Sequence, residues 1–180
     1  MRFSYLLVIA TSAIALTACN TMQPAGQTGG TQPQNNQQSA ESQTQAQQFF
    51  SAIEARRGSA LTMAERIQIQ GLTGSAKVGM NTAQSSFLNR VGAQIGMDGM
   101  LLAALFPEAS KPISENAAVS RIEKSLGKPL ASADQAAVRS AATLRNNSIS
   151  SVKTGLAANI GSRTGMSTEV VLALMPLLGF

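Results

Sequence analysis

The sequence predicts an all-α domain built from two related helical halves that share one core, preceded by a disordered linker. Two observations support this fold class. Apolar residues recur at helical spacing through residues 49–180, and no long alternating run of β-branched residues indicates strands there. The same region aligns with itself without a gap after a shift of 69 positions, which is typical of an internal repeat.

The repeat places residues 49–107 onto residues 118–176. Coincidence in an Ala-rich helical chain is the alternative interpretation. Glycine, methionine and proline residues of the first copy match the same residue types in the second copy at this one offset, which favours duplication. Residues 108–117 then form the joint between the copies. The agreeing pairs include Gly58/Gly127, Gly92/Gly161, Gly96/Gly165, Met97/Met166 and Pro107/Pro176.

Each half is predicted to begin with a helix that ends at a glycine, Gly58 in the first half and Gly127 in the second. A longer helix follows. In the first half it starts with a capping box formed by Thr62 and Glu65, and the segment 132–135 is the predicted counterpart in the second half. The first long helix carries an apolar stripe made of Ile69, Leu72, Ala76, Met80, Phe87, Leu88, Val91 and Ile95.

A short helix is predicted to close each half. Gly96 and Gly165 stop the long helices, and two residues later Asp98 and Ser167 offer side-chain oxygens that cap the next helix. The proline that follows each short helix then ends it, because proline lacks the N–H that a continuing helix needs.

The segments Val91–Leu105 and Ile160–Leu174 resemble the helix-turn-helix pattern, with glycine at the turn and apolar residues at set positions. DNA binding does not follow from this resemblance. Residues 99–106 carry no charge and residues 168–175 carry only Glu169, whereas a recognition helix presents Arg, Lys, Asn or Gln to the bases. We therefore expect a packing arrangement of two crossing helices and no nucleic-acid partner.

Residues 1–18 are predicted to form a secretory signal peptide. Arg2 gives it a positive start, and the apolar run Leu6–Leu16 is too short to span a membrane. The run ends in Leu16-Thr17-Ala18-Cys19, which resembles the lipobox of bacterial lipoproteins. This resemblance implies cleavage before Cys19 and acyl chains on its sulfur and its new amino group, and two or three such chains bind a bilayer stably. A secreted protein with a chance cysteine is the alternative.

Residues 19–48 are predicted to be the lipidated cysteine and a disordered tether. Gln, Ser, Thr, Gly, Asn and Pro dominate this stretch, and Glu41 is its only charged residue. A flexible chain of this length spans roughly 30 Å on average. An Asp after the cysteine resembles the signal for retention in the inner membrane of enteric bacteria. Asn20 stands there instead, which predicts the outer membrane, with the protein facing the periplasm.

The composition excludes most catalytic chemistry. The chain has no His and a single Cys, so we expect no zinc or copper site, no Ser–His pair and no cofactor. Its net charge of +5, from 14 basic and 9 acidic residues, fits solubility better than a nucleic-acid site. Glu54 and Glu123 occupy equivalent positions, so a hydrolase that uses this pair is an alternative. Solvated helix carboxylates are the simpler interpretation.

These features favour a membrane-anchored lipoprotein of the cell envelope that acts as a non-enzymatic interaction or structural module. Its expected partners are the lipid bilayer, through acylated Cys19, and another envelope protein. The alternatives are a pilotin-like escort of an outer-membrane secretion component and a binder of an apolar ligand between the two halves. The candidate interaction surface consists of apolar residues of the short helices and the end of the chain, namely Met100, Leu101, Phe106, Val170, Leu174, Leu177 and Phe180.

Overall fold

A computed structural model describes the backbone from residue 34 to residue 180 and the side chains from residue 43 onward. This described part is all-helical and contains no strand, which confirms the prediction of an all-α protein. The signal peptide, Cys19 and tether residues 20–33 lie outside it. The elements are α1 (Gln34–Arg57), α2 (Met63–Ile95), α3 (Gly99–Leu105), α4 (Glu115–Leu126), α5 (Ser132–Thr164), α6 (Thr168–Leu174) and a short 3₁₀ helix, η1 (Met175–Leu178).

The predicted tether is wrong for residues 34–48, because these residues form the first part of α1. The physical reason lies at the other end of the helix. Phe49, Phe50 and Ile53 are buried in the core and fix the helical turn around them. Once that turn exists, each further residue adds a backbone hydrogen bond at little entropic cost. The Gln- and Ala-containing segment before Phe49 then continues the helix, because both residue types favour the helical conformation.

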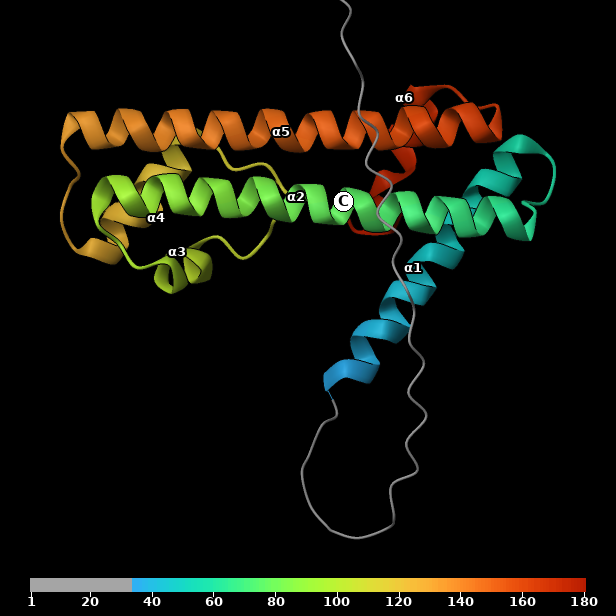
Figure 1. Ribbon diagram of the computed structural model, residues 1–180, viewed down its shortest axis with the longest axis horizontal. Helices are drawn as coiled ribbons and strands as arrows, with labels where there is room; N and C mark the ends of the chain where they lie inside the picture. Colours follow the sequence, from blue (N-terminus) through green and yellow to red (C-terminus); the bar gives the residue numbers. More distant parts are fainter. Residues whose placement is uncertain (1–33) are drawn as a thin grey trace, which may run out of the picture. The chain divides into compact units, whose positions relative to one another are not determined.

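Two long antiparallel helices, α2 and α5, organise the fold (Figure 1). Each has 33 residues and is therefore roughly 50 Å long. Hydrogen bonds join the two helices near both ends. Gln94 donates to Asp134 at 2.9 Å where α2 ends and α5 begins, and Arg163 donates to Gln68 at 2.5 Å at the opposite end. α1 packs near the start of α2, whereas α3 and α4 pack near the start of α5 (Figure 1).

The halves build two hydrophobic clusters rather than the single core that the sequence predicted. The long helices α2 and α5 extend through more than one packing layer, which explains why two clusters form instead of one core. Both halves contribute to each cluster. The first cluster includes Phe49, Phe50, Ile53, Ile69 and Met80 from the first half, and Leu156, Ile160, Val171, Leu174 and Leu178 from the second. The second cluster includes Phe87, Val91, Leu102 and Phe106, together with Val119, Ile122, Val138 and Ala142.

The helix bounds of the two halves agree at the sequence offset of the repeat. α2 and α5 have the same length, and so do α3 and α6. The predicted stops after the long helices are confirmed, because Gly96 and Gly165 lie in the left-handed region at φ values of 68° and 72°. Asp98 and Ser167 cap the short helices as predicted. Each half therefore contains a long helix, a glycine turn and a capped short helix.

The long helices begin differently. The predicted capping box of Thr62 and Glu65 is confirmed at the start of α2. Its predicted counterpart is wrong, because Ala131 occupies the N-cap position of α5 and makes no side-chain cap bond. Ser132 is already the first helical residue, so its hydroxyl lies one position too late to cap. The start of α5 thus lacks the side-chain cap that fixes the start of α2.

Acid is expected to weaken the start of α2 through protonation of Glu65. Its carboxylate accepts hydrogen bonds from the Thr62 N–H at 2.7 Å and from Arg57 at 2.7 Å. These bonds, that of the Thr62 N–H above all, lower the pKa of Glu65 from 4.5 to about 2. The stabilising contribution is therefore complete above pH 4.5 and is lost as the pH falls toward 2. The urea midpoint of the wild type should fall more steeply over this window than that of Glu65→Gln. Parallel profiles would contradict the assignment.

Candidate functional site

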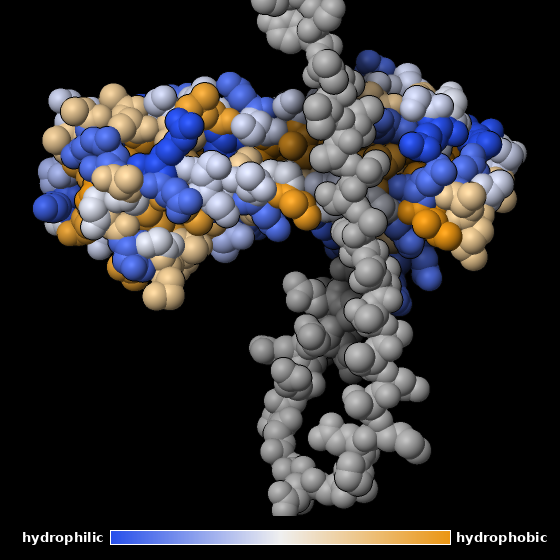
Figure 2. All heavy atoms as spheres, viewed as in Figure 1, coloured by the Kyte–Doolittle hydropathy of each residue, from blue (hydrophilic) through white to orange (hydrophobic). Residues whose placement is uncertain are grey.

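The candidate interaction surface predicted from the sequence is only partly exposed. Met100 and Leu101, on α3, have exposed fractions of 82% and 57%. Asp98 fixes them in place, since its carboxylate accepts the N–H groups of Met100 at 2.8 Å and Leu101 at 3.4 Å. Figure 2 shows hydrophobic residues projecting from the molecule where α3 lies. α3 thus presents two apolar side chains on a capped, seven-residue helix.

Phe106 and Leu174 do not belong to this surface, which corrects the prediction. Their exposed fractions are 2% and 6%. Phe106 packs edge-on against Phe87 in the second cluster, with ring centroids 5.1 Å apart, and Leu174 belongs to the first cluster. The chain has few large apolar residues for two cores, so both are used internally. Three other predicted members, Val170, Leu177 and Phe180, are half-buried.

Glu54 and Glu123 hold equivalent turns together. The Glu54 carboxylate accepts the Leu61 N–H at 2.9 Å and Arg66 at 2.6 Å. The Leu61 N–H and the Arg66 guanidinium, in that order, lower the pKa of Glu54. Glu123 accepts the Leu130 N–H at 3.0 Å and the Gln135 amide at 3.0 Å, and both partners lie at the repeat offset from those of Glu54. Each carboxylate therefore fastens the loop between two helices.

The two carboxylates do not form a pair. Glu54 lies beside the start of α2 and Glu123 beside the start of α5, and these helices run in opposite directions. Their starts are therefore separated by most of a helix length, roughly 50 Å. The carboxylates of a glycosidase pair lie about 5–10 Å apart. A hydrolase that uses both groups in one site does not fit this geometry.

Arg145 lies buried at the middle of the domain, with an exposed fraction of 2%. Its guanidinium donates to the carbonyl oxygens of Glu108 at 2.6 Å, Lys111 at 2.9 Å and Ala109 at 3.3 Å, and also to the Gln84 side chain. Burial lowers the pKa of Arg145. Among the described residues, its hydrogen-bond partners are carbonyl and amide oxygens rather than carboxylates, so oriented dipoles offset its positive charge.

Gln84 and Asn146, which neighbour Arg145, also form hydrogen bonds to the segment that joins the two halves. Gln84 donates to the Phe106 carbonyl at 2.6 Å. Asn146 accepts the Ile113 N–H at 3.0 Å and donates to the Ile113 carbonyl at 2.8 Å. Residues 106–113 are thereby held against both long helices. The sequence carried a sign of this role, because Arg145 falls at helical spacing between buried Val138, Ala142 and Ile149.

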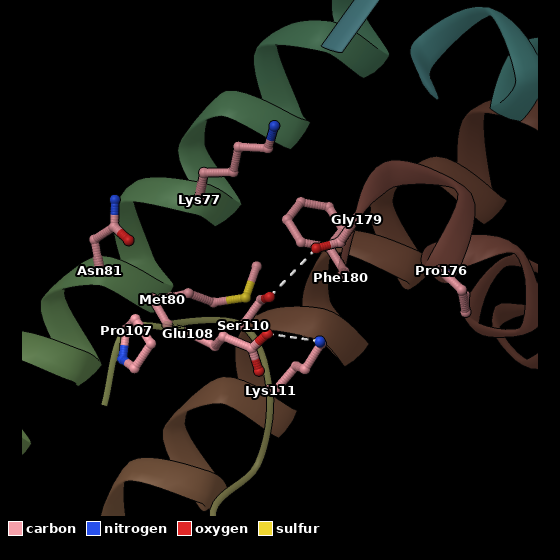
Figure 3. A pocket seen from close by; sticks show the side chains of 11 residues that line it. Lys77, Met80, Asn81, Pro107, Glu108, Ser110, Lys111, Pro176, Gly179 and Phe180 are labelled. Atoms are coloured by element: carbon pink, nitrogen blue, oxygen red, sulfur yellow. Dashed lines mark hydrogen bonds and ion pairs between the residues drawn. The ribbon is translucent and has the colours of Figure 1, made fainter. Parts of the chain in front are cut away.

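A cavity of about 670 Å³ lies where the two halves meet, beside this joint. Lys77, Met80 and Asn81 of α2 line one side, and segments 107–111 and 176–180 line the others (Figure 3). The two segments touch where the Ser110 hydroxyl donates to the Gly179 carbonyl at 3.3 Å. Lysine, amide and hydroxyl groups stand beside methionine, proline and phenylalanine in the lining. This cavity therefore offers both polar and apolar contacts.

A second cavity of about 270 Å³ lies between α1, α2 and η1. Its walls include Ala46 and Phe50 of α1, Ile69 of α2 and Leu178 of η1. Lys77 lines both cavities, and its ammonium lies 6.0 Å from the centre of the Phe180 ring. Sequence reasoning missed Lys77, because a single lysine in a long helix has the pattern of an ordinary solvent-facing residue.

Among the described residues, no cluster of His, Cys, Asp and Glu side chains could hold a metal ion. No helix in this part of the chain is long and apolar enough to cross a membrane. Comparisons with known protein families, with curated protein sequences and with solved structures find no match to this chain. A function must therefore be argued from its own residues and their geometry.

Proposed function

We propose that this protein is a lipoprotein of the cell envelope that acts as a non-enzymatic interaction module. The lipobox-like sequence Leu16-Thr17-Ala18-Cys19 supports the membrane anchor, which would hold the protein on the periplasmic side of the outer membrane through acylated Cys19. Structural use of the carboxylates supports a non-enzymatic role. Glu54, Glu65 and Glu123 all serve as caps or loop fasteners, so none is left free to act as an acid or base.

We also propose that residues 49–107 and 118–176 derive from one duplicated unit. Equal helix lengths at the same offset support this, as do the equivalent glycine turns. Glu54 and Glu123 add a more specific argument, because each accepts the N–H seven residues ahead and a side chain twelve residues ahead. Shared side-chain roles of this kind are harder to explain by helical composition alone than shared apolar spacing is.

The exposed apolar pair on α3 is the observation that carries the interaction role. Met100 and Leu101 are exposed while Phe106 and Leu174 are buried in the cores, so α3 presents two adjacent apolar side chains that a partner would cover. The Asp98 cap gives α3 a fixed direction, so a partner would meet a preformed apolar contact with little ordering cost. We expect an envelope protein as this partner, since the lipid anchor confines the encounter to the membrane surface.

The double variant Met100→Asp/Leu101→Asp is expected to lose this partner while remaining folded. Both substitutions fall in the first turn of α3, where acidic side chains suit the helix dipole. Cross-linking in intact cells, detergent extraction and mass spectrometry would identify what co-purifies with each form. The same samples give the acylation state of Cys19. Recovery of the partner should fall at least tenfold in the double variant.

Val78→Asp is the matched control, because Val78 is an exposed apolar residue on α2, away from α3. It should keep the partner at the wild-type level. Equal loss in both variants would indicate a general effect of added charge and would contradict a specific α3 contact. Recovery of no partner from wild-type cells would contradict the interaction role itself.

A further inference from the structure

The smaller cavity, between α1, α2 and η1, differs from the other cavities in its chemistry. Apart from Lys77, its lining consists of apolar groups and the uncharged residues Gln43, Gln70, Thr73 and Gly74. No carboxylate belongs to this lining. The cavity therefore combines an apolar interior with a single positive charge at its edge.

A helical glycine lies in the wall of this cavity. Gly74 lies on the α2 wall, and a Cβ atom added there would meet nothing within 4 Å. Glycine in the middle of a helix costs stability relative to alanine. Here it leaves space beside Phe50 and Ile69 that a larger side chain would occupy.

Lys77 connects this apolar space to the larger cavity. It lines both, and the larger one adds the side-chain amide of Asn81, which can donate hydrogen bonds (Figure 3). The other lysine of the larger cavity, Lys111, is already paired with Glu108 at 2.7 Å. Lys77 instead lies over the Phe180 ring, a contact that leaves its ammonium able to bind an anion.

We propose that these two cavities form one binding site for a single-chain anionic amphiphile. The acyl chain lies in the apolar cavity between α1, α2 and η1, and the negatively charged head group pairs with Lys77 and extends toward the Asn81 amide. Burial of the chain supplies affinity, and the lysine selects the charge of the head group. This inference is independent of the α3 contact, because the two use separate surfaces.

Binding can be measured by calorimetry on residues 19–180 carrying Cys19→Ser, which omits the predicted signal peptide and the predicted acylation site and allows work without detergent. Four probes with the same twelve-carbon chain separate the contributions: laurate, monolauroyl phosphatidylglycerol, neutral glycerol monolaurate and cationic lauroylcholine. Laurate, or the phosphatidylglycerol, or both, should bind at least tenfold more tightly than lauroylcholine. Binding of only one anion identifies whether the site prefers a carboxylate or a phosphate head group.

Two variants test the location of the site. Gly74→Leu fills the apolar cavity and should weaken laurate binding at least tenfold, while improving helix propensity. Gly155→Leu is the matched control, because Gly155 also has open space around it but lies on α5 and lines neither cavity. Lys77→Gln should weaken laurate at least fivefold and leave glycerol monolaurate unchanged.

Three results would overturn the proposal. These are no binding of either anionic probe, equal weakening by Gly74→Leu and Gly155→Leu, and equal affinity for laurate and lauroylcholine. Circular dichroism of each variant establishes that a loss of binding does not reflect unfolding.

Discussion

Replacing Arg145 with alanine is expected to lower the free energy of unfolding by about 4 kcal/mol. The substitution leaves the carbonyls of Glu108, Ala109 and Lys111 and the side chain of Gln84 without their shared donor. Buried acceptors that lose their donor cost about 1–3 kcal/mol each, and partial access of water reduces their sum. Urea unfolding followed by circular dichroism measures the difference.

Two further variants make the test of Arg145 specific. Arg121→Ala removes an exposed arginine that donates to the Leu105 carbonyl at 3.3 Å, and it should cost less than about 1 kcal/mol. Arg145→Lys keeps the charge but offers one ammonium where the guanidinium reaches five acceptor groups, so it should recover less than half of the loss. If Arg145→Ala stayed within 1 kcal/mol of the wild type, the joint would not depend on this residue.

Gly161→Ala is expected to destabilise the domain by about 2 kcal/mol, although alanine is the better helix former. A Cβ atom at Gly161 would lie 2.6 Å from the Met166 carbonyl oxygen, which is backbone and cannot move aside alone. The turn after α5 therefore has to shift. Its equivalent, Gly92, would place a Cβ 3.1 Å from the Met97 carbonyl oxygen, so Gly92→Ala should be close to neutral.

The measurement that tests this prediction is the order of stability of three glycine-to-alanine variants. Gly155→Ala meets open space and should stabilise the domain by about 0.5–1 kcal/mol. Thermal and urea unfolding should therefore rank the three variants as Gly155→Ala most stable, then Gly92→Ala, then Gly161→Ala. A stabilised Gly161→Ala would show that the turn moves without cost.

Sequence reasoning succeeded where the determining contacts are local. Gly96 and Gly165 end their helices because the left-handed conformation favours glycine, and Thr62 caps α2 because its partner Glu65 lies three residues away. It failed at the start of α5, where the apparent capping residue Ser132 is one position late. Local patterns therefore identified the helices and most of their ends.

The remaining errors concern contacts between distant residues. Phe106 was expected at the surface and lies in a core because Phe87, on another helix, covers it. The extension of α1 to Gln34 depends on the burial of residues farther along that helix. Lys77 gains its position only when α1 and η1 pack beside α2. The spacing of residues along the chain does not indicate directly which distant residues contact each other.

The sharing of both clusters between the halves also has a consequence for the order of folding. The cluster around Phe49 and Phe50 requires residues as late as Leu178, and the cluster around Phe87 requires Val138 and Ala142. Neither cluster is complete within residues 49–107. A chain that emerges with its amino end first must therefore extend to Ala142 before the second cluster closes, and to Leu178 before the first cluster closes. Until then its first half remains a substrate for chaperones and proteases.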